Sequence, residues 1–200
     1  MNTKHLDLGC GLSPRNPYLC QEVYGCDIRE IDADVEAIGF NYRRANVVTD
    51  PIPFPDDFFD SVSAFDFFEH VPRQVIFPSG KTGNPFVELM NEIHRVLKPG
   101  GRLLAATPAY PHASAFTDPT HVNFITQDTH NYFVGKNPGV AMYGFKGEFE
   151  IIKAVKDTPS NSYHPNEPNL RKNIRRIHRK LFREGLSHMI WEFKKPTAIV

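Results

Sequence analysis

The feature that most constrains the fold of this chain is a short strand-like run that ends abruptly in glycine. Residues 5–8 read His-Leu-Asp-Leu and are followed by Gly9, Cys10 and Gly11. Glycine adopts turn conformations that other residues avoid, and it lets a ligand approach backbone N–H groups that can receive its polar atoms. The pattern predicts the first strand of an α/β sheet with a ligand site at its carboxyl end.

The rest of the chain continues this alternation of short apolar runs with helical or turn patterns. Strand-like runs are predicted at 22–26, around 45–48, 60–65, 102–107, 149–155 and 189–193. A helix is predicted over 86–97, because its apolar residues recur at helical spacing and the Pro-Gly-Gly that follows ends it. Such alternation is typical of a parallel sheet with crossover helices, so we predict one α/β domain over residues 1–200.

Composition excludes several other classes of protein. With 40% hydrophobic and 23% charged residues, the 200-residue chain matches an ordinary globular domain rather than a disordered or fibrous protein. Three cysteines are too few for a disulfide scaffold, and no Cys-x-x-Cys pair indicates zinc. No apolar run is long enough to cross a bilayer, and the first residues do not resemble a secretory signal. We therefore expect a cytoplasmic protein with no membrane span.

The net charge of zero conceals an uneven distribution. Residues 1–150 hold 19 acidic and 12 basic side chains, whereas residues 151–200 hold 11 basic and 4 acidic ones. Much of the positive charge falls on a predicted helix whose apolar residues share one face: Leu170, Ile174, Ile177 and Leu181. We expect this helix to pack on the sheet with a basic outer face that is simply solvated. An anionic acceptor, a nucleic acid or a membrane surface stays open as its ligand, but without interleaved aromatic residues a nucleic acid is not favoured.

An acidic residue, Asp27, follows the second predicted strand. In nucleotide-binding α/β folds an acid at this point holds ribose hydroxyls, close to the glycine turn of the first strand. The glycine turn and Asp27 together therefore predict a ligand that contains a ribose.

Several segments in register resemble a known family. They are Leu-Asp-Leu-Gly-Cys-Gly at 6–11, Asp27, Asp-Pro-Ile-Pro-Phe-Pro-Asp-Asp-Phe-Phe-Asp at 50–60, Phe-Glu-His-Val at 68–71 and Arg-Val-Leu-Lys-Pro-Gly-Gly-Arg at 95–102. In this order, over roughly residues 4–108, they resemble class I S-adenosylmethionine (SAM)-dependent methyltransferases of the compact methyltransferase-domain type. The resemblance implies a Rossmann-like seven-stranded, mostly parallel sheet with an antiparallel last strand and helices on both faces. Residues 1–108 are then the cofactor-binding half, and residues 109–200 are the substrate-side and C-terminal half.

The resemblance also assigns the residues that bind SAM. The methionine portion is expected at the first strand end, the ribose at Asp27, the adenine beside Ile28 and Asn46, and the sulfonium near Phe65. The residues expected at the first strand end are Asp7, Leu8, Gly9, Cys10 and Gly11. Asn46 stands where the family often has an aspartate that accepts a hydrogen bond from the adenine amino group, and its amide oxygen can accept that bond too.

Two features depart from the family pattern. The third glycine of the usual Gly-x-Gly-x-Gly is Ser13, followed by Pro14, and few residues separate Gly11 from the second strand. The first crossover helix must therefore be very short or replaced by a turn. The sequence also shows no helices before the first strand that could cover a substrate. We expect the pocket to be open, or closed by the 108–135 loop or by a partner subunit, as in a homodimer.

Catalysis by such a protein rests chiefly on alignment. Methyl transfer from a sulfonium is an in-line displacement, and a base is needed only where the acceptor loses a proton. His70, Asp118 and His121 are the candidates for that base, because they follow the fourth and fifth strands at the carboxyl edge. His70 can instead fix a strand-to-helix turn, and Asp118 can bond its own backbone. Asp66 and Glu69 make a metal-like triplet with His70, but acids in the first turn of a helix explain it, and we expect no metal.

The resemblance thus implies transfer of a methyl group from SAM to an oxygen or nitrogen of a small-molecule or glycan-like acceptor. One rival, a nicotinamide-dependent oxidoreductase, is disfavoured because Gly-x-Gly-x-x-Gly would require glycine where Pro14 stands. The other rival is a non-catalytic methyltransferase-like adaptor that binds a partner or nucleic acid through its basic C-terminal helix. It stays open because the first crossover is so short.

Overall fold

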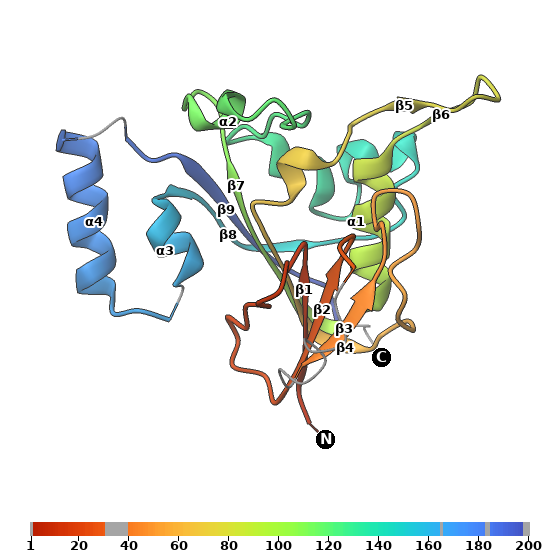
Figure 1. The fold of residues 1–200 in the computed structure, drawn as a ribbon, viewed down its shortest axis with the longest axis horizontal. Helices are drawn as coiled ribbons and strands as arrows, with labels where there is room; N and C mark the ends of the chain where they lie inside the picture. Colours follow the sequence, from red (N-terminus) through yellow and green to blue (C-terminus); the bar gives the residue numbers. More distant parts are fainter. Residues whose placement is uncertain (1, 31–39, 165, 183–184, 198–200) are drawn as a thin grey trace.

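The computed structural model describes residues 2–30, 40–164, 166–182 and 185–197. Its centre is a seven-stranded sheet in the order β3-β2-β1-β4-β7-β9-β8 (Figure 1). The strands are β1 (Lys4–Leu8), β2 (Glu22–Asp27), β3 (Asn41–Arg44), β4 (Phe59–Phe65), β7 (Leu97–Pro108), β8 (Glu150–Asp157) and β9 (His188–Lys194). Strands β1 to β4 and β7 pair in parallel, whereas β9 runs antiparallel to both of its neighbours. The predicted Rossmann-like sheet with an antiparallel last strand is confirmed.

Helices lie on both faces of this sheet. Helix α1 (Pro85–Val96) covers one face, and the short helix α3 (Pro159–Tyr163) lies against the other. Alternate residues of β7 show the division, because the side chains of a strand point to opposite faces in turn. Leu103 and Ala105 join the large core that includes α1, while Leu104 and Ala106 join a smaller core beside Tyr163.

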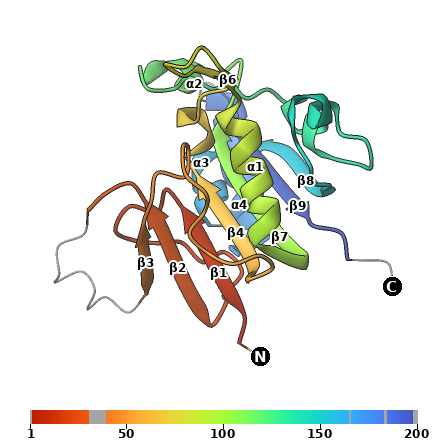
Figure 2. The same ribbon diagram turned by 90° about the vertical axis from the view of Figure 1, so that its right-hand side faces the viewer.

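Loops that follow β4 and β7 gather at the end of the sheet toward which the parallel strands run. Helix α2 (Ser114–Thr117) and the small hairpin of β5 (Val75–Ile76) and β6 (Thr82–Gly83) lie at this end in both views (Figure 2). Three short 3-10 helices complete the loops: η2 (Phe68–His70), η3 (Thr129–Phe133) and η4 (Gly139–Tyr143). This end is therefore where loop residues can meet the strand tips.

Helix α1 follows from its sequence. Pro85 occupies the first turn, where its missing N–H costs nothing, and Phe86, Leu89, Met90 and Ile93 form one buried face. The helix ends at Val96, one residue before the predicted end, because Pro99 cannot continue it. Strand β7 begins at once, so that the Pro-Gly-Gly segment forms part of the strand.

The third strand was predicted at the wrong place. Strand β3 spans Asn41–Arg44, and residues 45–48 lie in the turn after it, where the Asn46 carbonyl accepts the N–H groups of Thr49 and Asp50. β3 is the edge strand of the sheet and is largely exposed, so it lacks the apolar run that marks a central strand. Val47 is buried from the turn, which explains the misleading apolar signal.

The first crossover contains no helix, so of the two expected forms, a very short helix or a turn in its place, the structure shows the turn. Residues 9–21, all of which the structure describes, run as turns between β1 and β2. The Asn16 side chain holds this stretch, because its oxygen accepts the Cys20 N–H at 2.9 Å and its amide donates to the Cys20 carbonyl at 2.8 Å. The loop therefore has an ordered local structure in place of the missing helix.

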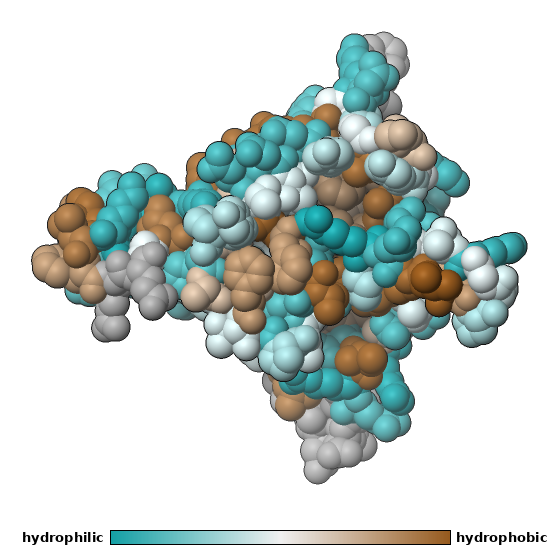
Figure 3. Space-filling view, turned by 90° about the horizontal axis from the view of Figure 1, so that it is seen from above, coloured by the Kyte–Doolittle hydropathy of each residue, from teal (hydrophilic) through white to brown (hydrophobic). Residues whose placement is uncertain are grey.

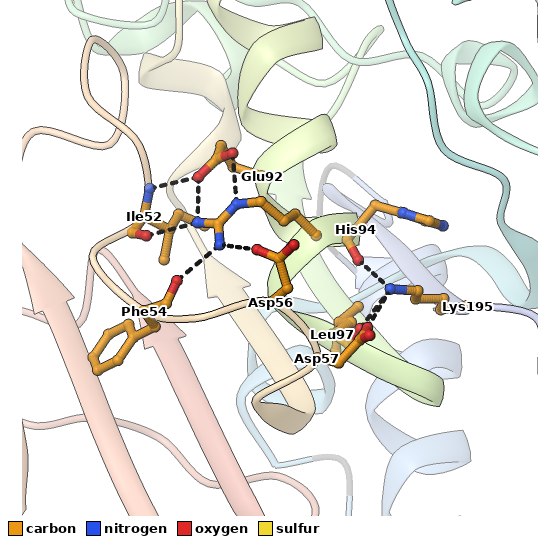
Figure 4. A network of polar contacts seen from close by, with 9 residues as sticks. Ile52, Phe54, Asp56, Asp57, Glu92, His94, Leu97 and Lys195 are labelled. Atoms are coloured by element: carbon orange, nitrogen blue, oxygen red, sulfur yellow. Dashed lines mark hydrogen bonds and ion pairs between the residues drawn. The ribbon is translucent and has the colours of Figure 1, made fainter.

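Arg95, near the end of α1, fixes the segment that leads into β4. Its guanidinium donates to the backbone oxygens of Ile52 and Phe54 at 2.8 Å each, and pairs with Glu92 at 2.7 Å and Asp56 at 2.8 Å (Figure 4). The hydrogen bonds to Glu92 raise the pKa of Arg95 further above its ordinary value. One side chain thus ties the irregular 52–56 segment to the helix, and so helps to position β4.

The C-terminal helix does not pack as predicted. Helix α4 (Asn169–Phe182) stands at the edge of the molecule, with α3 between it and the sheet (Figure 1). It contains no buried residue, and its apolar stripe faces solvent rather than the sheet. In the described part of the chain, no helix is long and apolar enough to cross a bilayer.

Candidate active site

The glycine turn after β1 has the predicted geometry. Gly9 and Gly11 have φ angles of +65° and +56°, and the Gly9 N–H donates to the Cys26 carbonyl of the neighbouring strand at 2.8 Å. A Cβ atom at Gly9 would lie 2.6 Å from the Phe67 ring, and one at Gly11 would lie 3.2 Å from the Arg29 side chain. Glycine is therefore required at Gly9 for both backbone conformation and close packing.

Asp27 holds this turn against the tip of β2. Its two carboxylate oxygens accept backbone N–H groups, from Gly11 at 2.8 Å and from Arg29 at 3.0 Å, and the residue is buried. Asp27 therefore also shapes the loop. Each carboxylate oxygen has two lone pairs, so the residue keeps acceptor capacity for ribose hydroxyls.

Asp7 connects the first strand to β4. The Ser63 hydroxyl donates to one of its oxygens, and the Arg15 N–H donates to the other at 2.8 Å. Burial raises the pKa of Asp7 to about 6. Its predicted place near the methionine portion of SAM stays a prediction, but the structure shows that Asp7 fixes the start of the loop 9–21.

The other predicted cofactor residues follow the same strand ends. Leu8 is buried in the core, and Ile28 after β2 is exposed. Burial raises the pKa of the Cys10 thiol to about 12, which makes it a neutral packing group. The Asn46 side-chain oxygen accepts the Val48 N–H at 3.3 Å.

Phe65, at the tip of β4, is buried in the smaller core. The Arg15 guanidinium lies over its ring, 4.9 Å from the centroid, and over the ring of Tyr163, 4.6 Å from the centroid. The strands β3, β2, β1 and β4 are consecutive in the sheet, so the predicted cofactor residues share one edge.

The three predicted catalytic residues form one chain of contacts beside that edge. Asp118 accepts hydrogen bonds from the N–H of Thr120 at 2.8 Å and from its hydroxyl at 2.7 Å. The same hydroxyl lies 3.0 Å from Nδ1 of His70. Because the hydroxyl donates its one proton to Asp118, it accepts the bond from the Nδ1–H of His70. The rings of His70 and His121 are 4.9 Å apart between centroids. Asp118 thus uses its exposed carboxylate to form a turn, and the two histidines lie in contact.

Glu69 joins this cluster as a buried acid. Only 1% of the residue is exposed, and neither carboxylate oxygen has a hydrogen-bond partner among the described residues. Oε1 lies 3.9 Å from Nε2 of His121. Burial raises the pKa of Glu69 to about 8, so the carboxyl group is protonated at neutral pH. An unpartnered acid beside a histidine is a common mark of a functional site.

The metal-like triplet suggested by the sequence is not formed as written. Asp66 points elsewhere: it accepts a hydrogen bond from Nε2 of His188 at 2.9 Å and another from the Tyr163 hydroxyl. Glu69 and His70 instead meet His121, and the potential ligand atoms of these three lie within 4.8 Å of one another. The sequence could not show this, because His121 comes from the loop after β7.

A large cavity lies among the loops that follow β4 and β7. It has a volume of about 920 Å³ and is lined by aromatic side chains, including Tyr110, Phe116 and Phe124. Arg73 links the cavity wall to the segment of Glu69. It donates to the Asn123 side chain at 2.7 Å and to the Phe124 carbonyl, and the Asn123 N–H donates to the Glu69 carbonyl at 2.9 Å. Sequence reasoning missed this cavity, because the segment that supplies most of its wall has no regular periodicity.

Comparison with known proteins bears on the family and on the fold. Residues 6–105 match the family described as methyltransferase domain. A search of curated proteins finds no match. Solved structures with the same fold include a SAM-dependent methyltransferase from Mesorhizobium loti, with 15% identity, a TM-score of 0.57 and coverage of 97% of this chain and 91% of that one.

Two further structures show how widely this fold is used. One is a chain from the complex of the Haloferax volcanii Trm112 methyltransferase activator with a methyltransferase, with 13% identity, a TM-score of 0.61 and coverage of 100% and 84%. The other is the [4+2]-cyclase SpnF, with 15% identity, a TM-score of 0.58 and coverage of 98% and 76%. At such identities the likeness shows the fold alone.

The residues present fit the cofactor of this family. A glycine turn exposes backbone at the tip of β1, and an acid with free lone pairs stands at the tip of β2. Together with the strand order and the matched half of the sequence, this places the protein in a family: the chain belongs to the methyltransferase-domain family of the class I SAM-dependent methyltransferases.

Proposed function

We propose that the protein transfers a methyl group from SAM to an oxygen or nitrogen atom of a small-molecule or glycan-like acceptor. The observation that carries this proposal is the meeting of the glycine turn and Asp27 at one sheet edge, linked by the hydrogen bond from Gly11 to the Asp27 carboxylate. SAM supplies an electrophilic methyl group on a positively charged sulfur. The chain has to hold and align the reactants, and alignment alone can supply several kcal/mol.

The cofactor contacts follow from the strand ends. Asp27 is placed to accept hydrogen bonds from ribose hydroxyls while it keeps the Gly9–Gly11 turn in position. Ile28 and Asn46 flank the place expected for adenine, and Phe65 lies at the tip of β4, where the sulfonium is expected. These assignments rest on the family pattern and on the positions of the strand ends in the sheet.

The aromatic cavity is the proposed acceptor site. Its volume suits a small molecule, and it opens at the edge where Arg73 follows β4 and Tyr110 follows β7. Exposed rings of Tyr110, Phe116 and Tyr132 offer flat surfaces for a planar ring or for the C–H face of a sugar. This arrangement supports an acceptor of modest size over a macromolecular one.

His121 is the proposed general base for an acceptor that loses a proton. Its Nδ1 lies 3.3 Å from the Ala115 carbonyl, which favours a proton on Nδ1 and leaves Nε2 as the basic atom. In this role Nε2 takes up the proton that the acceptor loses, beside the buried Glu69 carboxyl group, whose Oε1 lies 3.9 Å away.

The adaptor remains the second candidate, and one comparison favours keeping it. A chain of similar fold comes from a complex with a methyltransferase activator, which shows that such folds can bind protein partners. If the present chain is an adaptor, it will bind a partner without transferring labelled methyl groups to any acceptor.

The experiment is a methyl-transfer assay with labelled SAM and a panel of phenols, amines and sugars. We expect label to appear in an acceptor, and turnover to fall by about a hundredfold or more in His121→Ala if the acceptor is a hydroxyl. His178→Ala is the matched control, because this histidine is exposed on α4, away from the cluster. Unchanged turnover in His121→Ala would rule out the base assignment, and no transfer by protein that binds SAM would favour the adaptor.

A further inference from the structure

The apolar stripe of α4 faces solvent. Its residues Leu170, Ile174, Ile177 and Leu181 recur at helical spacing, and each is between 57% and 73% exposed. Figure 3 shows hydrophobic surface at the left end of the molecule, the position that α4 occupies in Figure 1. An exposed stripe of this kind costs free energy in water, so a surface normally covers it.

The opposite face of α4 is attached to the protein body by ion pairs. Arg175 pairs with Glu167 at 2.6 Å, and Arg176 pairs with the buried Asp157 at 3.2 Å. The Asn161 side chain also donates to the Lys172 carbonyl at 3.1 Å. If the helix rotated about its axis to bury the apolar stripe, these contacts would break. They therefore explain why the basic face of α4 points toward the protein and its apolar face toward solvent, the reverse of the usual amphipathic helix.

Basic side chains border the stripe on both sides. At 100° per residue, Arg171 and Lys180 project about a quarter turn to either side of it, and both are exposed. Residues 169–182 contain no acidic side chain. Lysine and arginine at the margins of an apolar face can keep their charges in water while the face enters an apolar layer.

We propose that α4 docks the protein on the surface of an anionic lipid bilayer. Leu170, Ile174, Ile177 and Leu181 would enter the boundary between headgroups and acyl chains, and Arg171 and Lys180 would contact the negatively charged headgroups. The positive charge along the stripe argues against a second copy of the chain as the surface that covers it. Two such helices packed stripe to stripe would bring the basic margins of each together with no acid to compensate. Nucleic acid is disfavoured, because two of the arginines are already paired with carboxylates of the protein.

Flotation with lipid vesicles tests this proposal. The full chain is mixed with vesicles of phosphatidylcholine alone, or with about 30% phosphatidylglycerol. We expect binding to the anionic vesicles, about tenfold weaker binding to the neutral ones, and release by about 0.5 M NaCl. Ile174→Ser/Ile177→Ser should bind about tenfold less or weaker still. Ile76→Ser is the matched control, because Ile76 is 77% exposed on the β5–β6 hairpin.

Circular dichroism checks that each variant is folded. We expect the substitutions on α4 to be tolerated, because Ile174 and Ile177 are exposed and lie outside the proposed SAM and acceptor sites. Equal vesicle binding by the wild type and by Ile174→Ser/Ile177→Ser would overturn the proposal. So would a wild type that ignores anionic vesicles. If the wild type ignores vesicles but dimerises in analytical ultracentrifugation, and the same double substitution abolishes the dimer, the stripe is an interface between copies instead.

Discussion

Replacing Glu69 by glutamine should remove a loss of stability that grows as the pH rises. The folded protein holds the pKa of Glu69 at about 8, whereas the unfolded chain exposes it with the ordinary value of 4.5. Between these two values the folded state binds the extra proton, so the free energy of unfolding falls as the pH rises from 4.5 to 8. At about 1.4 kcal/mol per pKa unit, the loss from pH 5 to pH 8 is about 3.5 kcal/mol.

Glutamine cannot ionise, so Glu69→Gln removes this loss and leaves the other titrating groups in place. The free energy of unfolding of the wild type and of Glu69→Gln is measured by urea unfolding, followed by circular dichroism, at pH 5, 6, 7 and 8. The difference in unfolding free energy should grow steadily with pH in favour of the glutamine variant, and level off above pH 8. A difference that stays constant over this range would show that Glu69 ionises freely in the folded protein, and would refute its description as a buried neutral acid.

Three other substitutions probe separate parts of the structure. Arg95→Met removes two charged hydrogen bonds to carbonyls from a side chain that is 29% exposed. It should lower the free energy of unfolding in urea by about 2 kcal/mol. An unchanged unfolding midpoint would show that Arg95 does not stabilise the 52–56 segment. Gly9→Ala forces a Cβ against Phe67 at positive φ, and should abolish SAM binding in calorimetry, whereas Gly80→Ala, also at positive φ but in open space, should leave it intact. Burial lowers the pKa of His5 to about 4, so stability should fall by about 3 kcal/mol from pH 6.5 to pH 4, and His5→Gln should be free of that loss.

The sheet and the meeting of the glycine turn with Asp27 could be predicted because their signals are local. A strand that ends in Gly-x-Gly, an acid at the next strand end and a helix stopped by Pro-Gly each specify their own geometry within a few residues. The topology then brings Gly11 and Asp27 within 2.8 Å without further information. Edge strand β3 was predicted at the wrong residues, because a strand exposed at the sheet edge needs no apolar run.

The orientation of α4 could not be predicted from its own residues. Periodicity shows that one face is apolar and the other basic, but not which of them turns inward. Ion pairs of Arg175 with Glu167 and of Arg176 with Asp157 fix the orientation of the helix. Both acids lie outside the helix, so its own periodicity does not reveal these pairs.

The cluster of Glu69, His70 and His121 and the aromatic cavity also depend on tertiary structure. Glu69 and His121 lie far apart in the chain and meet only when the loop after β7 folds over η2, where backbone bonds from residues 122 and 123 to the Glu69 carbonyl hold it. The sequence named both histidines of the cluster, and it considered Glu69 only as a metal ligand.

The most direct test of the central claim is calorimetric titration of the purified protein with SAM and S-adenosylhomocysteine, with NAD as the control ligand. We expect micromolar binding of both sulfur ligands and no binding of NAD. The affinity of Asp27→Asn, which keeps the size of the side chain but loses its charge, should be about tenfold weaker or worse. Folded wild-type protein that binds neither sulfur ligand, or that binds NAD instead, would contradict the cofactor site at the tips of β1 and β2.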